Sequence, residues 1–503
     1  MRLRDIDLPV EAEDAIAVLR KGAFVEHEAY RAMLNIGGIC IVGRKGDGKS
    51  ATRIGLKESN GMARELWLEM SMKSFDPSKL NDLIRDQARS KRPQQLLLRR
   101  IWRFTILCGL ARAARNHQIL FKRVETLRTR VPSFLKKYRL QDDTFDVVPD
   151  RVLENVLYVR DWPTDPNSLA QFPLDDESLQ LESSIISALG HDKGLGSVIT
   201  VDDLDPCLEM FDEMIVPAAQ ELVAMSRDLV RLYGEKYKFR IKCFVPRDMF
   251  SQFDDRHLDK MAKNTTEIQW SAQDLEKLLA RYLAPYMEGR LRSDPDLYAP
   301  EVVAKVLGTH VVGYVNPKVR AFDMVKFHST YRPRDILYFT QQLINRQVAQ
   351  DSDSEEINAT KFVYYLSEAT RERSQTAITE YSGKYPILRK QVELLRGLSA
   401  RFKGSRLRSI WQGHNQQAGQ SLDEGDWEFF LQGLFDSGVL GFFSLVPSQA
   451  TLREAAVFSF ANPTGRLSSD LELAIHPMFW QFLQTIPKKF VIYGAGGGFI
   501  TPP

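Results

Sequence analysis

The sequence predicts an α/β fold with three parts: a core on a parallel sheet with a helical insertion, an α-helical lid, and a C-terminal winged-helix domain. Three observations support this prediction. A glycine-rich loop stands between an apolar run at residues 37–42 and a potential helix at residues 51–56. Two more apolar, β-prone runs follow at residues 197–201 and 239–245. The last third of the chain orders helices before two strands, as a winged helix does.

Length and composition indicate a folded protein of several domains. A chain of 503 residues is long enough for roughly two to four domains. With 44% hydrophobic and 26% charged residues, it has the composition of a globular rather than a disordered protein. Its four cysteines are widely spaced, which excludes a CxxC metal site and a disulfide framework. The pattern of a serine or cysteine hydrolase is also absent from the sequence.

The N-terminus and the hydropathy pattern predict a cytoplasmic protein. The chain is charged from its second residue and lacks the apolar segment of a signal peptide. Nowhere do about 18 uncharged apolar residues run together, so we expect no membrane-spanning segment.

Charge is unevenly distributed although the net charge is only +3. Residues 85–139 contain sixteen Lys or Arg and two acids, whereas residues 142–182 contain eleven acids and two Arg. These tracts are interpreted first as facing or solvated helix surfaces of one inserted subdomain. The alternative is a basic surface for nucleic acid or for an acidic partner.

The loop at residues 43–50 (GRKGDGKS) has the G-x-x-x-x-G-K-[ST] pattern of a P-loop NTPase core, with a strand before it and a helix after it. Its glycines permit backbone conformations in which successive N–H groups converge on a phosphate at the helix N-terminus. Lys49 is expected to reach the β and γ oxygens of a nucleotide, and the Ser50 hydroxyl to bind Mg²⁺. The predicted nucleotide-binding residues are Gly43, Gly46, Asp47, Gly48, Lys49, Ser50 and Ala51.

A second strand should end in a carboxylate that holds the metal ion. Asp202 follows the β-branched run at residues 197–201 and is the predicted Mg²⁺ residue, acting directly or through water. Asp203 takes the position where many ATPases of this broad class carry a Glu that orients the attacking water, and its shorter side chain predicts slow hydrolysis. Asp205 either orients Asp203 or caps the next helix, and capping is favoured.

Arginines at two other places are candidate nucleotide sensors. Arg247 directly follows the third predicted strand, and neighbouring ends of parallel strands line one crevice. It either points at the γ-phosphate or forms a surface ion pair. Arg332 and Arg334 flank a proline where an amphipathic helix begins, and a cation there is unfavourable unless an anion lies nearby. We therefore predict that Arg334 senses nucleotide from a lid, and Arg332 is the one candidate for an arginine finger.

The sequence of the last third predicts a winged helix that has features both for and against DNA binding. Between residues 384 and 408, eight basic residues accompany Glu393 alone, which suits DNA phosphates. The third helix has no row of side chains for base edges apart from Gln432, so protein contact or lid packing is favoured over DNA. The expected elements are helices at 386–396, 405–413 and 426–437, strands at 438–446 and 455–463, and a closing helix at 477–485.

Five segments in this order resemble the KAP and STAND side of the AAA-like P-loop ATPases, and in particular bacterial stand-alone ATPases with a GRKGxGKSA loop. The segments are GRKGDGKSAT, VITVDDLD, FVPRDMF, IQWSAQDLEKLLARYL and YRPRDIL. The resemblance covers about residues 10–375 and implies an ATPase core, a helical lid and a switch driven by ATP with Mg²⁺. Matched by motif, it assigns phosphate and Mg²⁺ to Lys49 and Ser50, metal and water to Asp202 and Asp203, a first sensor to Arg247 and a lid sensor to Arg334.

The resemblance also bears on biological setting and on domain boundaries. KAP relatives often carry transmembrane segments, which this sequence lacks, so a membrane role is not carried over. Many such ATPases act in bacterial conflict systems such as phage defence, which makes antiviral defence an expectation from the family alone. The predicted domains are a core at residues 1–265 with a helical insertion at about 75–190, a lid at 266–375, and a winged-helix-like domain at 376–503.

Three functions remain open at the level of sequence. The favoured one is a switch-type ATPase that controls its own homo-oligomeric assembly or a separately encoded effector protein. The second is a DNA-binding ATPase of the replication-initiator kind, using the winged helix and the basic tracts. A small-molecule P-loop kinase is the least favoured, because the lid and the C-terminal domain have no place in it.

Overall fold

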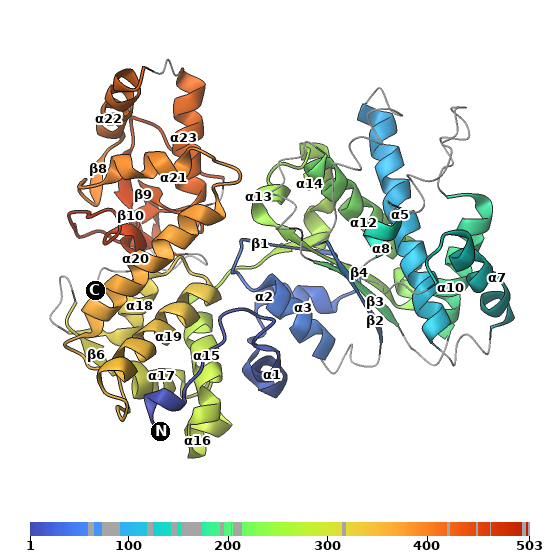
Figure 1. Ribbon diagram of the computed structural model, residues 1–503, viewed down its shortest axis with the longest axis horizontal. Coiled ribbons are helices and arrows are strands. Elements are labelled where there is room, and N and C mark those ends of the chain that lie inside the picture. Colours follow the sequence, from blue (N-terminus) through green and yellow to red (C-terminus); the bar gives the residue numbers. More distant parts are fainter. Residues whose placement is uncertain are drawn as a thin grey trace. The chain divides into compact units, whose positions relative to one another are not determined.

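The computed structural model describes residues 1–58, 65–72, 91–117, 124–141, 148–152, 154, 174–191, 196–202, 204, 214–313, 318–419, 423–448, 451–462, 464–494 and 499–500 (Figure 1). Contacts within the chain divide it into two compact units. The sheet unit contains Glu28–Lys45 and Lys49–Ile268. The C-terminal unit contains Met1–His27, Gly46–Gly48 and Gln269–Pro503. The finer division into core, lid and winged-helix domain stays a prediction.

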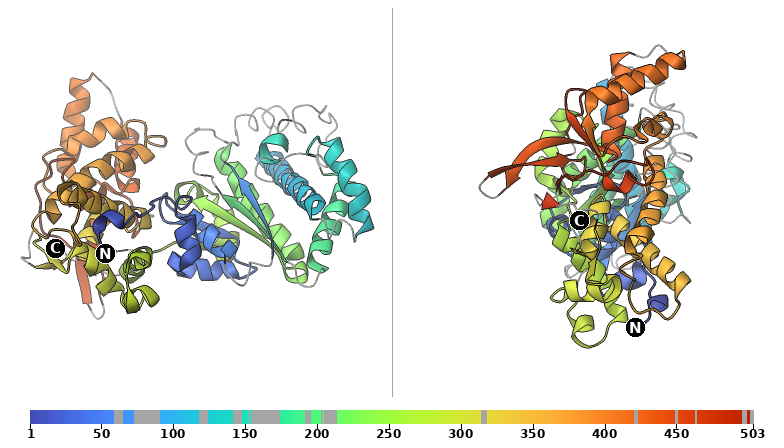
Figure 2. Two further views of the ribbon diagram at one scale, coloured as in Figure 1. Left: turned by 60° about the horizontal axis from the view of Figure 1, so that its bottom comes forward. Right: turned by 90° about the vertical axis from the view of Figure 1, so that its left-hand side faces the viewer.

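The sheet unit is built on a sheet that lies between helices (Figure 2). Its five parallel strands have the order β2-β3-β4-β1-β5. This confirms the predicted α/β class and parallel sheet. The β3 sequence SVITVD is buried at every position, as expected for a β-branched strand with both faces covered. The strands are β1 (Cys40–Gly43), β2 (Leu66–Ser71), β3 (Ser197–Asp202), β4 (Phe239–Pro246) and β5 (Thr265–Glu267).

Register places the carboxyl ends of three strands side by side. Gly43 of β1 pairs with Pro246 of β4, and Val201 of β3 pairs with Cys243 of β4. The loop that follows β1 and the residues that follow β3 and β4 therefore leave the sheet at one edge. Strand β4 lies between β1 and β3, so one strand separates the loop after β1 from Asp202 at the end of β3.

Helices of the sheet unit build a large apolar core against the strands. The Trp102 indole donates to the Ala218 carbonyl at 2.9 Å and joins α5 to α12. Arg103 of α5 binds the buried carboxylate of Glu182 in α10 through two hydrogen bonds, of 2.7 and 2.9 Å. The helices are α2 (Glu28–Leu34), α3 (Lys49–Glu58), α5 (Lys91–Asn116), α7 (Glu125–Lys137), α8 (Val148–Val152), α10 (Asp176–His191), α12 (Ile215–Tyr237), α13 (Arg247–Phe250) and α14 (Asp255–Met261).

Part of the basic tract faces part of the acidic tract. Besides the Arg103–Glu182 pair, Lys137 of α7 lies 3.9 Å from Asp175, just before α10. Figure 1 shows α5, α7 and α10 gathered within the sheet unit. These contacts support the interpretation as facing helix surfaces of one subdomain; most of residues 142–173 lie outside the described residues.

The first part of the C-terminal unit is helical. Helix α15 begins at a Ser271 cap, whose hydroxyl accepts the Asp274 N–H at 3.1 Å. The N-terminal segment belongs here, since the Leu3 N–H donates to the Ser354 carbonyl at 2.9 Å. The elements are η1 (Leu3–Asp5), α1 (Ile16–Val18), η2 (Leu19–Ala23), α15 (Ala272–Leu283), η6 (Ala284–Tyr286), α16 (Gly289–Ser293), α17 (Ala299–Leu307), β6 (His310–Val311), β7 (Val319–Arg320), α18 (Ala321–His328), α19 (Pro333–Gln350) and α20 (Phe362–Glu380).

The second part joins helices to a six-stranded sheet of order β13-β12-β10-β9-β11-β8. Strands β9 and β10 form the expected hairpin after three helical segments, but β11 lies between β9 and β8, so the winged-helix assignment stays a prediction. The elements are α21 (Leu388–Gln391), η7 (Val392–Leu395), β8 (Arg401–Lys403), α22 (Gly404–Gln417), α23 (Glu424–Asp436), β9 (Leu440–Ser448), β10 (Thr451–Val457), β11 (Glu472–Ile475), η8 (Pro477–Phe479), β12 (Ile492–Tyr493) and β13 (Phe499–Ile500).

The predicted closing helix at residues 477–485 is wrong. Only the three-residue 3-10 helix η8 forms, and turns follow it. Gln484 adopts φ +50°, which a continuing right-handed helix cannot accommodate. Chain contacts across the turn replace helical hydrogen bonds: the Gly397 N–H donates to the Leu483 carbonyl at 2.9 Å.

Half of the basic residues in the stretch at residues 384–408 form ion pairs. Four of its eight cations pair with acids that are distant or adjacent in sequence. Arg401, for example, lies 3.0 Å from Glu454 and 2.5 Å from Glu472. This pairing favours protein packing over DNA contact. The four pairs are Lys384–Asp436, Arg396–Glu393, Arg401–Glu454 and Arg408–Glu424.

Among the helices that the structure describes, none combines the length and the apolar character that crossing a membrane requires.

Candidate functional site

Two glycines of the loop at residues 43–50 adopt the left-handed backbone conformation. Gly46 and Gly48 have φ +87° and +96°, in the region that favours glycine. The ammonium of Lys49 is buried and donates to the carbonyls of Gly43 (3.0 Å) and Arg44 (3.3 Å), so its charge lies inside the loop. Helix α3 starts at Lys49, which places Ser50 and Ala51 in its first turn.

Asp202 is buried at the end of β3 and is held by a cation from α3. The Arg53 guanidinium donates to Asp202 at 3.0 Å and to Glu69 of β2 at 2.5 Å. Burial raises the pKa of Glu69, but the hydrogen bond from Lys57 and the charge of Arg53 outweigh it, and the pKa is lowered. A positive charge thus already faces the carboxylate that was predicted to bind Mg²⁺. Asp203 and Asp205 lie outside the described residues.

Arg247 begins α13 and forms an ion pair with Glu267 of β5. Strand β1 lies between β4 and β5, so this pair spans the end of β1, where the loop begins. The side chains of Arg247 and Glu267 are 11% and 27% exposed, so the ion pair considered as the alternative is present and is partly buried. A role at the γ-phosphate stays a prediction.

Within the C-terminal unit, Arg334 contacts the middle of the loop. Its main-chain N–H donates to the Gly46 carbonyl at 3.5 Å, and a Cβ at Gly46 would lie 3.1 Å from the Arg334 Cβ. The guanidinium binds Glu11 of the N-terminal segment at 2.5 Å and lies 3.7 Å from Glu380 of α20. The anion expected at this helix start is therefore supplied by the chain's own carboxylates.

A buried charge network lies behind Arg334. Asp335 is fully buried and accepts hydrogen bonds from Arg373 (2.9 Å) and from the Thr330 N–H (3.0 Å) and hydroxyl (2.5 Å). Arg332, also buried, lies 3.5 Å from Glu380. Burial would raise the pKa of Asp335, but the charges of Arg373 and Arg332 hold it well below its usual range.

The network extends to the loop through Asp47. Burial would lower the pKa of Arg332, but Tyr381, Asp335, Glu380 and Asp47 together raise it. Asp47 is 1% exposed, and its carbonyl accepts the Trp270 indole N–H at 2.8 Å. With 3% of its surface exposed, Arg332 does not suit the role of a finger that reaches a neighbouring subunit.

The residues present fit a nucleotide with Mg²⁺. The loop combines two left-handed glycines with a buried cation, and Asp202 is a buried carboxylate one strand away. In the part of the chain that the structure describes, no three His, Cys, Asp or Glu side chains gather to hold a metal ion. Mg²⁺ would therefore take most of its ligands from phosphate and water, as is usual for this ion with nucleotides.

Sequence reasoning missed four residues that contact the predicted ones or their partners: Arg53, Glu69, Glu11 and Glu380. Arg53 stands four residues after Lys49, on the same face of α3, and this helical spacing could have indicated it. Glu69 was missed because β2 was not predicted. Glu11 and Glu380 carry no local signal, because they meet Arg334 only through tertiary packing.

Comparison with known proteins identifies no family. No protein-family model matches the chain, and no curated protein matches it either. Among solved structures, the chain is similar to one described as Drosophila ORC bound to DNA, with 10% sequence identity over 94% of each chain and a TM-score of 0.26. A TM-score this low does not establish a shared fold.

Proposed function

We propose that this protein binds and hydrolyses ATP at residues 43–50 and acts as a switch that controls assembly or a separately encoded effector. One observation carries the proposal. The loop with left-handed Gly46 and Gly48 and the buried Lys49 leaves the same sheet edge at which Asp202 ends β3. A carboxylate, a buried ammonium and a glycine-rich loop at one edge are what a nucleotide with Mg²⁺ needs.

Each residue has a proposed role. When ATP is bound with Mg²⁺, its phosphates would bring negative charge into the site, and the metal ion would neutralise part of that charge. Lys49 exchanges the carbonyls of Gly43 and Arg44 for phosphate oxygens. Ser50 and Asp202 hold the metal ion, and Arg53 leaves Asp202 when the ion arrives, since both cations compete for one carboxylate. Asp203 orients the attacking water, and its short side chain makes hydrolysis slow.

The switch is proposed to run through Arg334 and Arg247. Arg334 contacts Gly46 at the loop and is held by Glu11 and Glu380. A γ-phosphate in the loop offers a stronger anion than the exposed Glu11, so ATP is expected to draw Arg334 away from the N-terminal segment. Hydrolysis removes that anion and returns Arg334 to Glu11. The N-terminal segment is therefore released with ATP and retained without it.

Solution mass tests the switch. Light scattering is expected to show a larger assembly with a non-hydrolysable ATP analogue than with ADP or without nucleotide. The Lys49→Ala variant should keep one mass in all three states, because it lacks the cation that binds the phosphates. An unchanged mass of the wild-type protein in every state would reject control of its own assembly.

Glu11→Gln tests the role of Arg334. Exposed ion pairs of this kind contribute roughly 0.2–1 kcal/mol, so freeing Arg334 is expected to tighten ATP binding by up to about fivefold. Glu13→Gln is the matched control, since Glu13 is exposed on the same segment, and it should change nothing. Titration with a fluorescent ATP analogue measures both. Unchanged or weaker binding by Glu11→Gln would exclude Arg334 as the sensor.

A further inference from the structure

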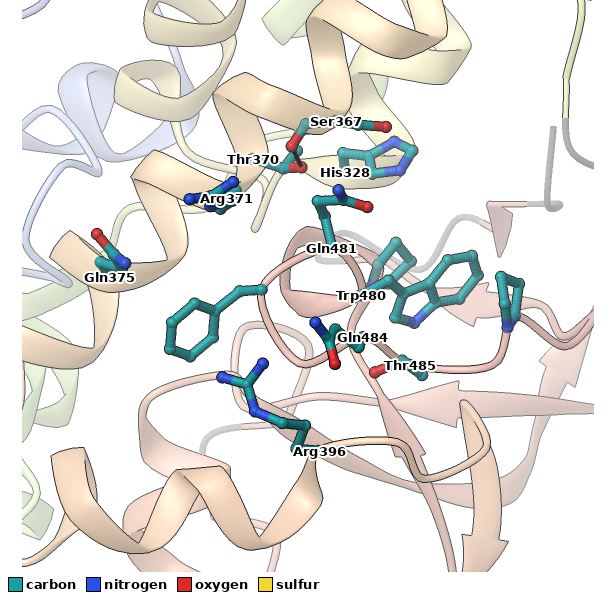
Figure 3. Close-up of a pocket in the computed structure, with 13 residues that line it drawn as sticks. His328, Ser367, Thr370, Arg371, Gln375, Arg396, Trp480, Gln481, Gln484 and Thr485 are labelled. Carbon is teal, nitrogen blue, oxygen red and sulfur yellow. Dashed lines mark hydrogen bonds between the residues drawn. The ribbon is translucent and has the colours of Figure 1, made fainter.

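A cavity of about 600 Å³ lies within the C-terminal unit, and none of the residues assigned to ATP is among those that line it. One wall is helix α20, and another is the turn that follows η8 (Figure 3). Its volume falls in the range of small-molecule sites, roughly 300–1,000 Å³. Polar side chains dominate its lining, which sets it apart from an ordinary packing defect.

The cavity is positively charged. Arg371 of α20 and Arg396, just after η7, line it from different sides (Figure 3). Among the described residues that line it, none is acidic. Arg396 pairs with the exposed Glu393 at 2.6 Å, a type of contact that contributes little and is readily exchanged. Burial lowers the pKa of His328 to about 4, so this lining residue is neutral at pH 7 and the charge comes from the arginines.

One feature of the turn after η8 suggests a ligand. Gln484, which lines the cavity, has φ +50°, a conformation that is strained for a side chain of this kind and that recurs at binding sites.

We propose that this cavity binds a phosphate monoester of a polyhydroxylated compound, such as a sugar phosphate. Two guanidinium groups suit a phosphate, which accepts their parallel N–H groups. The amides of Gln375, Gln481 and Gln484 each donate and accept hydrogen bonds, as sugar hydroxyls do. An apolar ligand would leave all of these groups unpaired. The inference does not rest on the proposed ATPase function.

Calorimetric titration with ribose 5-phosphate tests the proposal. The Lys49→Ala protein is used so that phosphate binding at residues 43–50 does not contribute, and wild type is measured in parallel. We expect a dissociation constant of about 1 mM or tighter. Free ribose offers only hydroxyl groups and inorganic phosphate offers only the anion. Each is therefore expected to bind at least roughly tenfold more weakly than ribose 5-phosphate. Binding of inorganic phosphate equal to that of ribose 5-phosphate would mean an adventitious anion site only and would overturn the proposal.

Substitutions in the cavity locate the binding. Arg371→Gln together with Arg396→Gln is expected to weaken binding by roughly tenfold or more, because both charge-assisted contacts are lost. Arg389→Gln is the matched control, since Arg389 is exposed on α21 of the same unit and does not line the cavity. Unchanged binding by the double variant would overturn the assignment to this cavity.

Discussion

Asp335→Ala is expected to lower the free energy of unfolding of the C-terminal unit by about 3–5 kcal/mol, the usual cost of breaking a buried ion pair by removing one partner. Asp335 is fully buried and balances the charges of Arg373 and Arg332. Alanine leaves both guanidinium groups buried with less negative charge around them, and it leaves the Thr330 N–H and hydroxyl without their acceptor. Urea unfolding followed by tryptophan fluorescence measures the loss.

The control is Asp353→Ala. Asp353 is 65% exposed and pairs with Arg2 and Arg4 at the surface, so its loss should cost less than about 1 kcal/mol. A similar small loss for Asp335→Ala would show that the network does not hold α19 and α20 together as we describe.

Acidity should erase the difference between wild type and Asp335→Ala. Because the folded pKa of Asp335 lies well below its unfolded value of about 3.9, its carboxylate contributes stability that is fully present above that pH. This contribution is lost as the pH falls through the folded pKa. The two proteins should therefore differ most at neutral pH and converge in acid, and a constant difference down to pH 2 would contradict the ionised state of Asp335.

Lys49→Ala is expected to weaken ATP binding by roughly 10- to 100-fold and to abolish hydrolysis. Hydrogen bonds from a charged donor contribute about 1.5–3 kcal/mol each, and a buried ammonium gains more because little water competes. Lys49 is 6% exposed, so water cannot replace its charge at the phosphates. The substitution should leave the fold intact, because the hydrogen bonds from Lys49 to the carbonyls of Gly43 and Arg44 stay within one short loop.

The parts predicted from sequence are those whose signal is local. Strands β1, β3 and β4 and helix α3 lie within a few residues of their predicted ranges, because apolar β-branched runs and a glycine-rich turn are adjacent in the chain. Strand β2 was missed because its sequence LWLEMS is neither continuously apolar nor strictly alternating, and Glu69 interrupts the apolar run. Strand β5, with only three residues, is too short to leave a pattern.

The electrostatics of the site could not be predicted, because they depend on residues that meet only in the fold. From the sequence we expected an anion near Arg334 and assigned a nucleotide to that place. In the structure the anion is Glu11, which is 323 residues away in the chain. Likewise, Arg53 meets Asp202 only because α3 packs beside the sheet, and Asp335 of α19 pairs with Arg373 of α20. The arginine at the start of this helix therefore indicated that an anionic partner was needed, but not which residue supplies it.

The measurement that tests the central claim most directly is a titration of wild type, Lys49→Ala and Lys45→Ala with ATP in the presence of Mg²⁺. Lys45 lies in the same loop but is exposed, so Lys45→Ala removes one positive charge from the loop and keeps the buried ammonium of Lys49. The account predicts that wild type and Lys45→Ala bind with affinities within about threefold of each other and that Lys49→Ala binds roughly 10- to 100-fold more weakly. Equal ATP affinity for all three proteins would contradict nucleotide binding at residues 43–50.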